Sequence, residues 1–419
     1  MGQAFRISAA GKAALPQGQL AADITLTRLD APGLAALQLD IAPQAERLFA
    51  RLEISEPPGG VLASALGAAA EPAQVMLRLE GPARGATLNA EARLGGAAEA
   101  ALAGSISADA EGVGFARVSG HIAAARLLPA QWTEALRRLE FSLDASRNQA
   151  GVIRFSDIKA SAPVGEVVLS GTLDPKREEA ALQGSVALGA SPLLAGILPE
   201  QLGFEAARAR FEVHGALAAP KLVVEAGLQG FTSSIAELSA ALGTSPKLHL
   251  KASAPRRIES LTLTGAGVEL TAAGDVGETL DLSFGLRLAD LARVVPGLAG
   301  ALTAEGQVQG ARDDPSLSLQ ARGESITRGA EVLAAPELVL RLETLLSHPR
   351  AEARLNATYA GLPLTLELQG RPEGAALRLH QLDAAFGPAR LTGGGLLDLQ
   401  KSLFEGTLSL TVPDLAPLA

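Results

Sequence analysis

The sequence predicts an all-β protein: an elongated, mainly antiparallel repeat sheet, curled into a U-shaped hydrophobic groove, with a few short helices. Three observations predict it. Apolar and polar residues alternate with a period of two along most of the chain, as in strands with one apolar and one polar face. Gly, Pro, Asp and short polar clusters separate these runs, which is turn chemistry. A stretch that begins at Ser191 recurs from Leu291, which is typical of a repeat architecture.

The alternating runs predict about two dozen strands of about seven to ten residues. Clear runs cover residues 86–94, 280–288, 351–359, 364–368 and 408–412. Most connections between the runs are short, whereas parallel strands need crossovers of about a dozen residues or more. We therefore expect antiparallel meanders, and a parallel β-helix is the main rival architecture.

Helical patterns are few and short. They predict helices over Val61–Ala69, Gln131–Arg138 and Ser233–Leu242, the last with Ser233 or Ser234 as its cap and Gly243 at its end. Two short apolar segments, 193–198 and 288–295, which we call apolar knots, could each form one or two helical turns. We expect these pieces to join one group of strands to the next.

The repeat sets the expected domain organisation. In both copies an apolar knot ends in Pro (Pro199, Pro296), and an alternating run then closes on Gly (Gly215, Gly310) before a second run begins. We expect one continuous array over 1–419, with candidate units 1–125, 126–190, 191–290 and 291–413. Residues 414–419 resemble the opening of the second copy at Asp290, so we interpret the chain as a piece of a longer repeat protein.

Composition restricts the possible partners. Nearly half of the residues are apolar but only 3% are aromatic, so the apolar surface should be smooth and aliphatic. The net charge is −9 with acids and bases interspersed, and without a basic patch nucleic acid is not an expected partner. There is no cysteine. The N-terminus has no signal-peptide pattern, and the most apolar window, 59–70, is too short to span a bilayer.

Catalytic and cofactor motifs are absent from the sequence. The Gly-x-Gly pairs at Gly112 and Gly265 lack the third glycine of a dinucleotide fingerprint and are better interpreted as turns. The five histidines are scattered, and Asp313-Asp314 falls in a turn. Trp132 is expected to be a packing anchor. We therefore expect no enzymatic activity, no catalytic residues, no metal and no cofactor.

A long sheet with one apolar face has to cover that face, and the helices are too few to do so. Curling into a trough with an apolar inside solves this, and an aliphatic lining suits flexible phospholipid acyl chains. The residues that we expect to line this groove are Leu280, Leu282, Phe284, Leu286, Leu288, Leu317, Leu319, Leu364, Leu366, Leu368, Leu408 and Leu410.

The sequence resembles the TamB family, within the AsmA-like bridge-like lipid-transfer proteins. The resemblance rests on the Asp-Leu-Ala openings at Asp290 and Asp414, on the knots ending in Leu-Pro or Val-Pro, and on the strand pairs 215–225 and 310–320. In the segments 55–62, 393–399 and 406–413, the pattern of apolar and turn residues is also similar to that of the family. These are turn and packing patterns rather than a catalytic signature.

This resemblance implies a β-taco groove across the periplasm that carries phospholipid between the inner and outer membranes and supports outer-membrane biogenesis. It also implies an inner-membrane anchor and contact with an outer-membrane Omp85-type barrel, TamA, although neither can be placed on residues of this chain. A scaffold for outer-membrane protein assembly or secretion, which would offer sheet edges to new strands, is one alternative. A structural β-solenoid is the other.

Overall fold

The chain was analysed as a computed structural model, which describes residues 4–14, 19–42, 46–82, 84–108, 113–124, 126–194, 201–253, 256–345, 347, 349–373, 376–398 and 403–413. Its contacts divide it into two compact units, Met1–Pro220 and Lys221–Ala419, and we describe each unit by itself. Residues 195–200, which end the first knot, and residues 414–419 lie outside the described residues.

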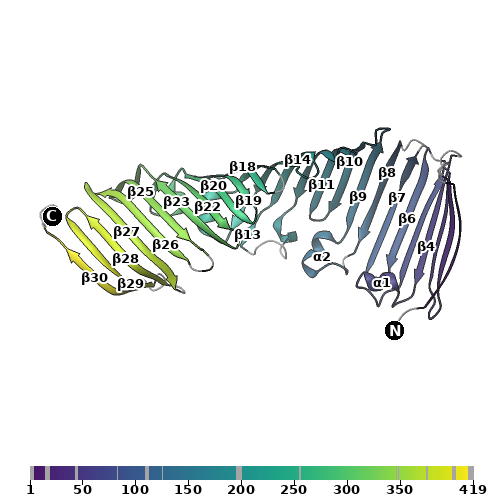
Figure 1. Cartoon of the computed structure of the whole chain (residues 1–419), viewed down its shortest axis with the longest axis horizontal. Helices are drawn as coiled ribbons and strands as arrows, with labels where there is room; N and C mark the ends of the chain where they lie inside the picture. Colours follow the sequence, from purple (N-terminus) through teal and green to yellow (C-terminus); the bar gives the residue numbers. More distant parts are fainter. Residues whose placement is uncertain are drawn as a thin grey trace. The chain divides into compact units, whose positions relative to one another are not determined.

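Unit 1 is a meander of strands joined by tight turns and short helical pieces (Figure 1). Its helical pieces are α1 (Val61–Ala65), α2 (Ala130–Leu136) and η3 (Ser191–Leu194). Its strands are β1 (Phe5–Ala14), β2 (Gln19–Arg28), β3 (Leu34–Ala42), β4 (Arg47–Glu56), β5 (Ala73–Gly81), β6 (Ala86–Leu94), β7 (Ala98–Ala108), β8 (Gly114–Ala123), β9 (Leu139–Arg147), β10 (Ile153–Ala162), β11 (Gly165–Asp174), β12 (Glu179–Leu188), β13 (Leu202–Gly203) and β14 (Ala206–Ala216).

Unit 2 has the same character. Its helices are α3 (Ala236–Leu242) and α4 (Leu291–Val294). Its strands are β15 (Lys221–Gln229), β16 (Thr232–Ser233), β17 (Lys247–Ser253), β18 (Arg257–Thr264), β19 (Val268–Val276), β20 (Thr279–Leu288), β21 (Ala299–Gly300), β22 (Leu302–Ala311), β23 (Asp314–Arg322), β24 (Ser325–Arg328), β25 (Glu331–Glu343), β26 (Arg350–Tyr359), β27 (Leu362–Glu373), β28 (Ala376–Phe386), β29 (Ala389–Asp398) and β30 (Leu403–Thr411).

The long strands of each unit pair in chain order and antiparallel. In unit 1 the ladder runs without a break from β1 through β12 to β14. In unit 2 it runs from β15 to β30, with the short β21 and β24 added beside β25. These pairings confirm the all-β, antiparallel prediction, and they exclude a parallel β-helix.

The three helices occur where the sequence predicts them, but all are shorter than predicted. The first ends at Ala65 rather than Ala69, and the second covers 130–136 rather than 131–138. The predicted cap of the third helix was wrong. It begins at Ala236 after an uncapped Ile235, because Ser233 is used elsewhere: its backbone N–H and C=O both bond the Ser239 hydroxyl, at 2.8 and 3.0 Å.

Other local predictions about the two helices of unit 2 are confirmed. Gly243 ends α3 with a positive φ of 64°, a conformation that glycine adopts without strain. The knot after β20 forms α4, which the Asp290 side chain caps by accepting the Ala292 N–H at 3.0 Å. The Asp-Leu-Ala opening at Asp290 is therefore a helix start.

The two repeat copies share backbone geometry. Gly215 and Gly310, at equivalent positions, have φ values of 103° and 102°. Two residues later, Leu217 and Arg312 donate backbone N–H groups to the carbonyls of Glu178 and Glu278, at 2.7 and 2.9 Å. Because an L side chain is strained at such φ values, glycine is required at this point of each copy.

Neither sheet has a conventional core. The side chains with no exposed surface are Ala63, Ala86 and Ala135, and no large side chain of the described residues is fully buried. Small clusters do form where helical pieces pack on the sheet: Ala63 with Ala73 and Leu94, and Ala135 with Val164 and Leu194. Most of each sheet is therefore a single layer, with the rest of its apolar face uncovered by any described element.

Candidate functional surface

The strand registers assemble the apolar side chains of unit 2 into one face. Residues opposite one another on paired strands point to the same side of a sheet, so a line of partners can be followed across all strands. The row that we call the central row consists of Leu250, Leu261, Ala272, Phe284, Gly306, Leu319, Leu340, Ala353, Leu368, Leu382, Gly393 and Leu408.

All twelve residues expected from the sequence lie on this face. Leu319, Leu368 and Leu408 stand in the central row with Phe284. One neighbouring row contains Leu282 and Leu317, and the other contains Leu286, Leu366 and Leu410. The remaining residues, Leu280, Leu288 and Leu364, extend the face toward its two edges.

The face is open to solvent. Ten of these twelve side chains are partly exposed, and Leu408 and Leu410 are 48% and 66% exposed. The lining residues named from the sequence all lie in unit 2, because the first hundred residues use Ala and Gly where unit 2 uses Leu. Unit 1 nevertheless has a matching apolar face, as the alternating run 86–94 indicated. Its row consists of Leu39, Ala50, Leu79, Leu88, Gly104, Val118, Leu143, Ile158, Leu169, Gly184 and Phe211.

Aromatic rings lie flat on this face, over glycines of the neighbouring strand. A Cβ on Gly306 would be 2.5 Å from Phe284 Cζ, and one on Gly184 would be 2.5 Å from Phe211 Cζ. Phe404 Cζ would similarly lie 2.9 Å from a Cβ on Gly395 of the neighbouring β29, and 2.8 Å from one on Gly406 of its own strand. Pairing a large ring with a residue that has no side chain fills the gap on the neighbouring strand and keeps the apolar surface even.

The opposite face is polar, and many of its charged side chains form ion pairs or hydrogen bonds with one another. Arg354 and Glu367 form an ion pair at 2.8 Å across β26 and β27. Glu337 accepts bonds from Arg322 and Gln320 at 3.0 and 2.7 Å, and these lower the pKa of its carboxyl. Further pairs of the same kind join Arg390 to Asp383, whose pKa is likewise lowered by the hydrogen bond from the arginine.

A broad hollow lies on this polar face. It has a volume of about 820 Å³, and its lining includes Thr271, Ser283, Gln307, Ser318 and Arg341. Its lining side chains are small on β19 and β20, where they include Thr271 and Ser283, and longer on β22 and β25, where they include Gln307 and Arg341. The period-two pattern could not locate this hollow, because alternation shows which face is polar but not where that face is raised or hollowed.

The two edges of each sheet differ. The edge that we call the helix edge includes α1, α2 and η3 in unit 1, and α3 and α4 in unit 2. The opposite edge, the turn edge, is formed by tight turns such as β9–β10, β11–β12, β22–β23 and β27–β28. Figure 1 shows α1 and α2 along one edge of unit 1.

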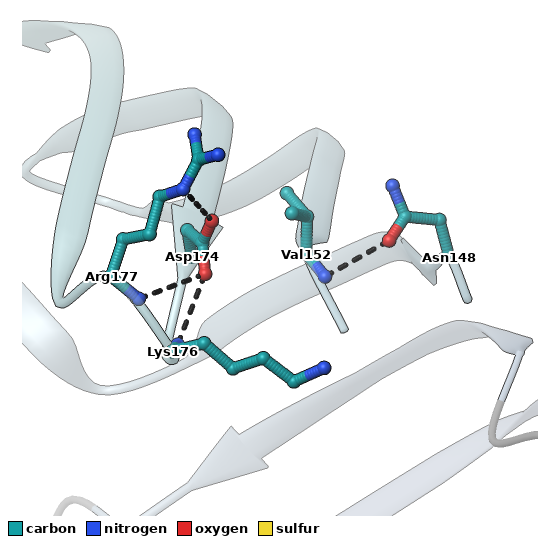
Figure 2. A network of polar contacts seen from close by, with 5 residues as sticks. All are labelled: Asn148, Val152, Asp174, Lys176 and Arg177. Carbon is teal, nitrogen blue, oxygen red and sulfur yellow. Dashed lines mark hydrogen bonds and ion pairs between the residues drawn. The ribbon is translucent and has the colours of Figure 1, made fainter. Parts of the chain in front are cut away.

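Polar contacts stabilise the turns of the turn edge (Figure 2). Asp174 accepts the backbone N–H groups of Lys176 and Arg177 at 3.0 and 3.1 Å, and its other oxygen lies 3.8 Å from Arg177 Nε. In the neighbouring turn, Asn148 Oδ1 accepts the Val152 N–H at 3.0 Å. In unit 2, Asp314 plays a similar part by accepting the Ser347 N–H at 3.2 Å.

The residues considered for catalysis or metal binding are dispersed. His121 and His249 each lie near one glutamate, at 3.9 and 3.6 Å, while His214 and His380 are exposed strand residues. His348 and Gly112 lie outside the described residues. In the part of the chain that the structure describes, no three His, Cys, Asp or Glu side chains gather as a metal site.

Comparison of the chain with protein-family models, curated proteins and solved structures finds no match. None of the described helices has the length and apolar character needed to cross a bilayer.

Proposed function

We propose that this chain is a section of a lipid conduit, in which the apolar face binds phospholipid acyl chains. The observation that carries the proposal is the continuous, mainly aliphatic face, which extends from β3 to β14 in unit 1 and from β17 to β30 in unit 2. No described element covers this face as a whole. Exposed contiguous apolar surfaces of this extent mark binding sites, because leaving them in water is unfavourable.

The chemistry of the face favours flexible hydrocarbon over other apolar ligands. Its side chains are mainly Leu, Val and Ala, with rings laid flat, and its polar counterpart is occupied by ion pairs on the other side of the sheet. Such a surface offers apolar area without directional bonds. Each methylene removed from water contributes about 0.8 kcal/mol, so an acyl chain gains affinity along its whole length.

The TamB resemblance supports a location and a route. Under this proposal the full-length protein bridges the periplasm, is anchored in the inner membrane and contacts an outer-membrane partner of the TamA kind. Phospholipid would then move from strand to strand along the apolar face, between the two membranes. The absence of directional contacts supports this, because a ligand held only by apolar area can slide.

The test places a photo-crosslinking amino acid at Leu282, Phe284 or Leu286 in cells that express the chain in its natural context. These positions should yield phospholipid adducts, identified by mass spectrometry. Ser283 is the matched control, since it lies on the same strand and points to the polar face. Equal or greater lipid capture at Ser283 would contradict the proposal.

The same experiment examines the alternatives. Adducts with polypeptide in place of lipid at the three apolar positions would favour a scaffold for outer-membrane protein assembly. Protein that carries no lipid after mild purification, and gives no adducts of either kind, would favour a purely structural role.

A further inference from the structure

We propose that the hairpin of β24 and β25, with the adjoining end of β26, forms a headgroup site that holds one phospholipid on the apolar face. The ligand class is a glycerophospholipid whose headgroup carries a phosphate and a primary amine. Arg328 binds the phosphate, Glu331 binds the amine, and Tyr359 lies beside the ester region. This inference rests on the proposed function, and it adds a place where a lipid that otherwise slides is held.

A bulge in β25 brings a charged residue to the apolar side of the sheet. The register between β25 and β26 shifts by one residue within 334–337. After the shift the even-numbered residues of β25, such as Leu338, lie on the apolar face, whereas before it the odd-numbered residues do. Leu333 accordingly lies opposite Tyr359. Glu331, two residues before Leu333, points to the same side. An unbroken period-two pattern would place Glu331 on the polar face, so the sequence pattern could not find this site.

Arg328 joins this carboxylate on the same side of the hairpin. Arg328 and Glu331 are opposite partners on β24 and β25, next to the turn at Gly329 and Ala330. Both are exposed, and neither forms an ion pair with another described residue. A guanidinium binds phosphate through paired hydrogen bonds, and a carboxylate accepts charge-assisted hydrogen bonds from an ammonium group. Two opposite charges side by side therefore match a headgroup that carries a phosphate and an amine.

Tyr359 places a hydroxyl between these charges and the aliphatic side chains. It is the only tyrosine of the chain. Its ring contacts that of Phe386 on β28, with the ring centroids 5.8 Å apart, so the two rings meet across the intervening β27. Tyrosine is favoured where one end of the ring is apolar and the other is hydrated. Diagonal neighbours on adjacent strands are about 7–8 Å apart, so one lipid can contact both Tyr359 and Glu331.

The polar face carries a comparable pair of charges, which provides a matched control. Arg341 and Glu352 are opposite partners on β25 and β26, and they too form no ion pair with a described residue. They differ from Arg328 and Glu331 in lying on the other side of the sheet. A lipid whose acyl chains lie on the apolar face cannot place its headgroup against them.

The experiment places a photo-crosslinking amino acid at Ala330, in the hairpin turn, or at Phe284, on the apolar face away from the hairpin. The full chain is mixed with vesicles of phosphatidylethanolamine and phosphatidylglycerol, which share a phosphate but differ in the amine. Mass spectrometry identifies each adduct, and fragmentation shows whether it joins the headgroup or an acyl chain. We expect headgroup adducts at Ala330, several-fold more with phosphatidylethanolamine, and acyl adducts of both lipids at Phe284.

Substitutions separate the three roles. Glu331→Gln should remove the preference for phosphatidylethanolamine at Ala330, because it removes the partner of the amine. Arg328→Gln should reduce headgroup adducts of both lipids several-fold, and Arg328→Lys should restore part of them. Tyr359→Phe keeps the ring contact with Phe386, and it should lower headgroup adducts without lowering the melting temperature.

The control variant is Arg341→Gln/Glu352→Gln, which removes the same charges from the polar face and should leave the adducts at Ala330 unchanged. The headgroup site would be overturned by a comparable loss in this variant, or by headgroup adducts that survive Arg328→Gln/Glu331→Gln.

The two proposals fail in different ways. Acyl adducts at Phe284 without headgroup adducts at Ala330, or with polypeptide adducts there, would overturn the headgroup site alone. No lipid adducts at Phe284 in the chain that carries no other substitution would overturn the proposed function.

Discussion

Single residues decide how even the apolar face is. Gly306 stands beneath the ring of Phe284, and a Cβ there would also lie 2.5 Å from the Ser318 carbonyl oxygen on the next strand. The ring can move, but the backbone oxygen cannot move without disturbing the β22–β23 ladder. The glycine is therefore required by packing on two sides.

Replacing Gly306 with valine should consequently destabilise unit 2. Overpacking of this kind costs about 1–3 kcal/mol, which a lowered thermal unfolding midpoint would report. Gly85→Ala is the control, because a Cβ at Gly85 meets nothing within 4 Å and the change should stay within about 0.5 kcal/mol. Similar shifts for the two variants would show that the Phe284 contact has no packing role.

The ion pairs of the polar face predict a pH dependence. Hydrogen bonding from Arg390 lowers the pKa of Asp383 in the folded protein below its unfolded value of about 3.9. A lowered pKa stabilises the fold above the unfolded value, and this stabilisation is lost as the pH falls through the folded pKa. The melting-temperature difference between the wild type and Asp383→Asn should thus be present at pH 6 and shrink below about pH 4. A difference that grows on acidification would contradict the assignment.

At the scale of elements, local residue patterns predicted where helices occur but not how each one starts. Residues 233–242 contain two serines in front of an apolar run, and either could have capped the helix by sequence criteria. The tertiary structure instead uses the Ser239 hydroxyl to bind the backbone of Ser233, which shortens the helix at its start. Such competition between backbone partners depends on contacts that a local pattern does not contain.

The cap of α4 gives an element-scale prediction. Asp290→Ala removes the acceptor of the Ala292 N–H, and loss of an N-cap costs about 1 kcal/mol. Hydrogen exchange should show faster exchange at Ala292 and Arg293, with the paired strands β20 and β22 little affected. Asp290→Asn keeps an acceptor and should behave nearly as the wild type does. Uniform loss of protection throughout unit 2 would mean that the Asp290 cap stabilises the whole unit and not α4 alone.

At the scale of the molecule, the sequence shows which face of each strand is apolar, but it does not show which strands pair with one another. Period-two alternation placed Leu282, Phe284 and Leu286 on one side of one strand, and the structure aligns them with Leu317, Leu319 and Leu366 from other strands. That alignment could be inferred only as far as short connections implied neighbours in chain order. The relief of the polar face and the difference between the two edges depend on twist, turn length and helix packing, which alternation does not encode.

The single-layer design has a consequence for the protein without lipid. A face of partly exposed leucines in water is unfavourable, and without acyl chains a second copy of the chain could cover it. Lipid that binds only the folded state should also raise its stability by mass action. Delipidated protein should therefore associate and melt at a lower temperature, and added phospholipid should reverse both changes, as followed by light scattering and calorimetry.

A matched pair of variants separates this effect from general destabilisation. Leu366→Asp puts a charge beside Leu355 on the apolar face, whereas Thr365→Asp puts the same charge on the exposed polar face of the same strand. Only Leu366→Asp should reduce both the association of delipidated protein and its response to phospholipid, because a buried carboxylate opposes any apolar cover. If delipidated wild-type protein stays monomeric and its melting does not respond to lipid, the apolar face is not a lipid-binding surface, however continuous its rows.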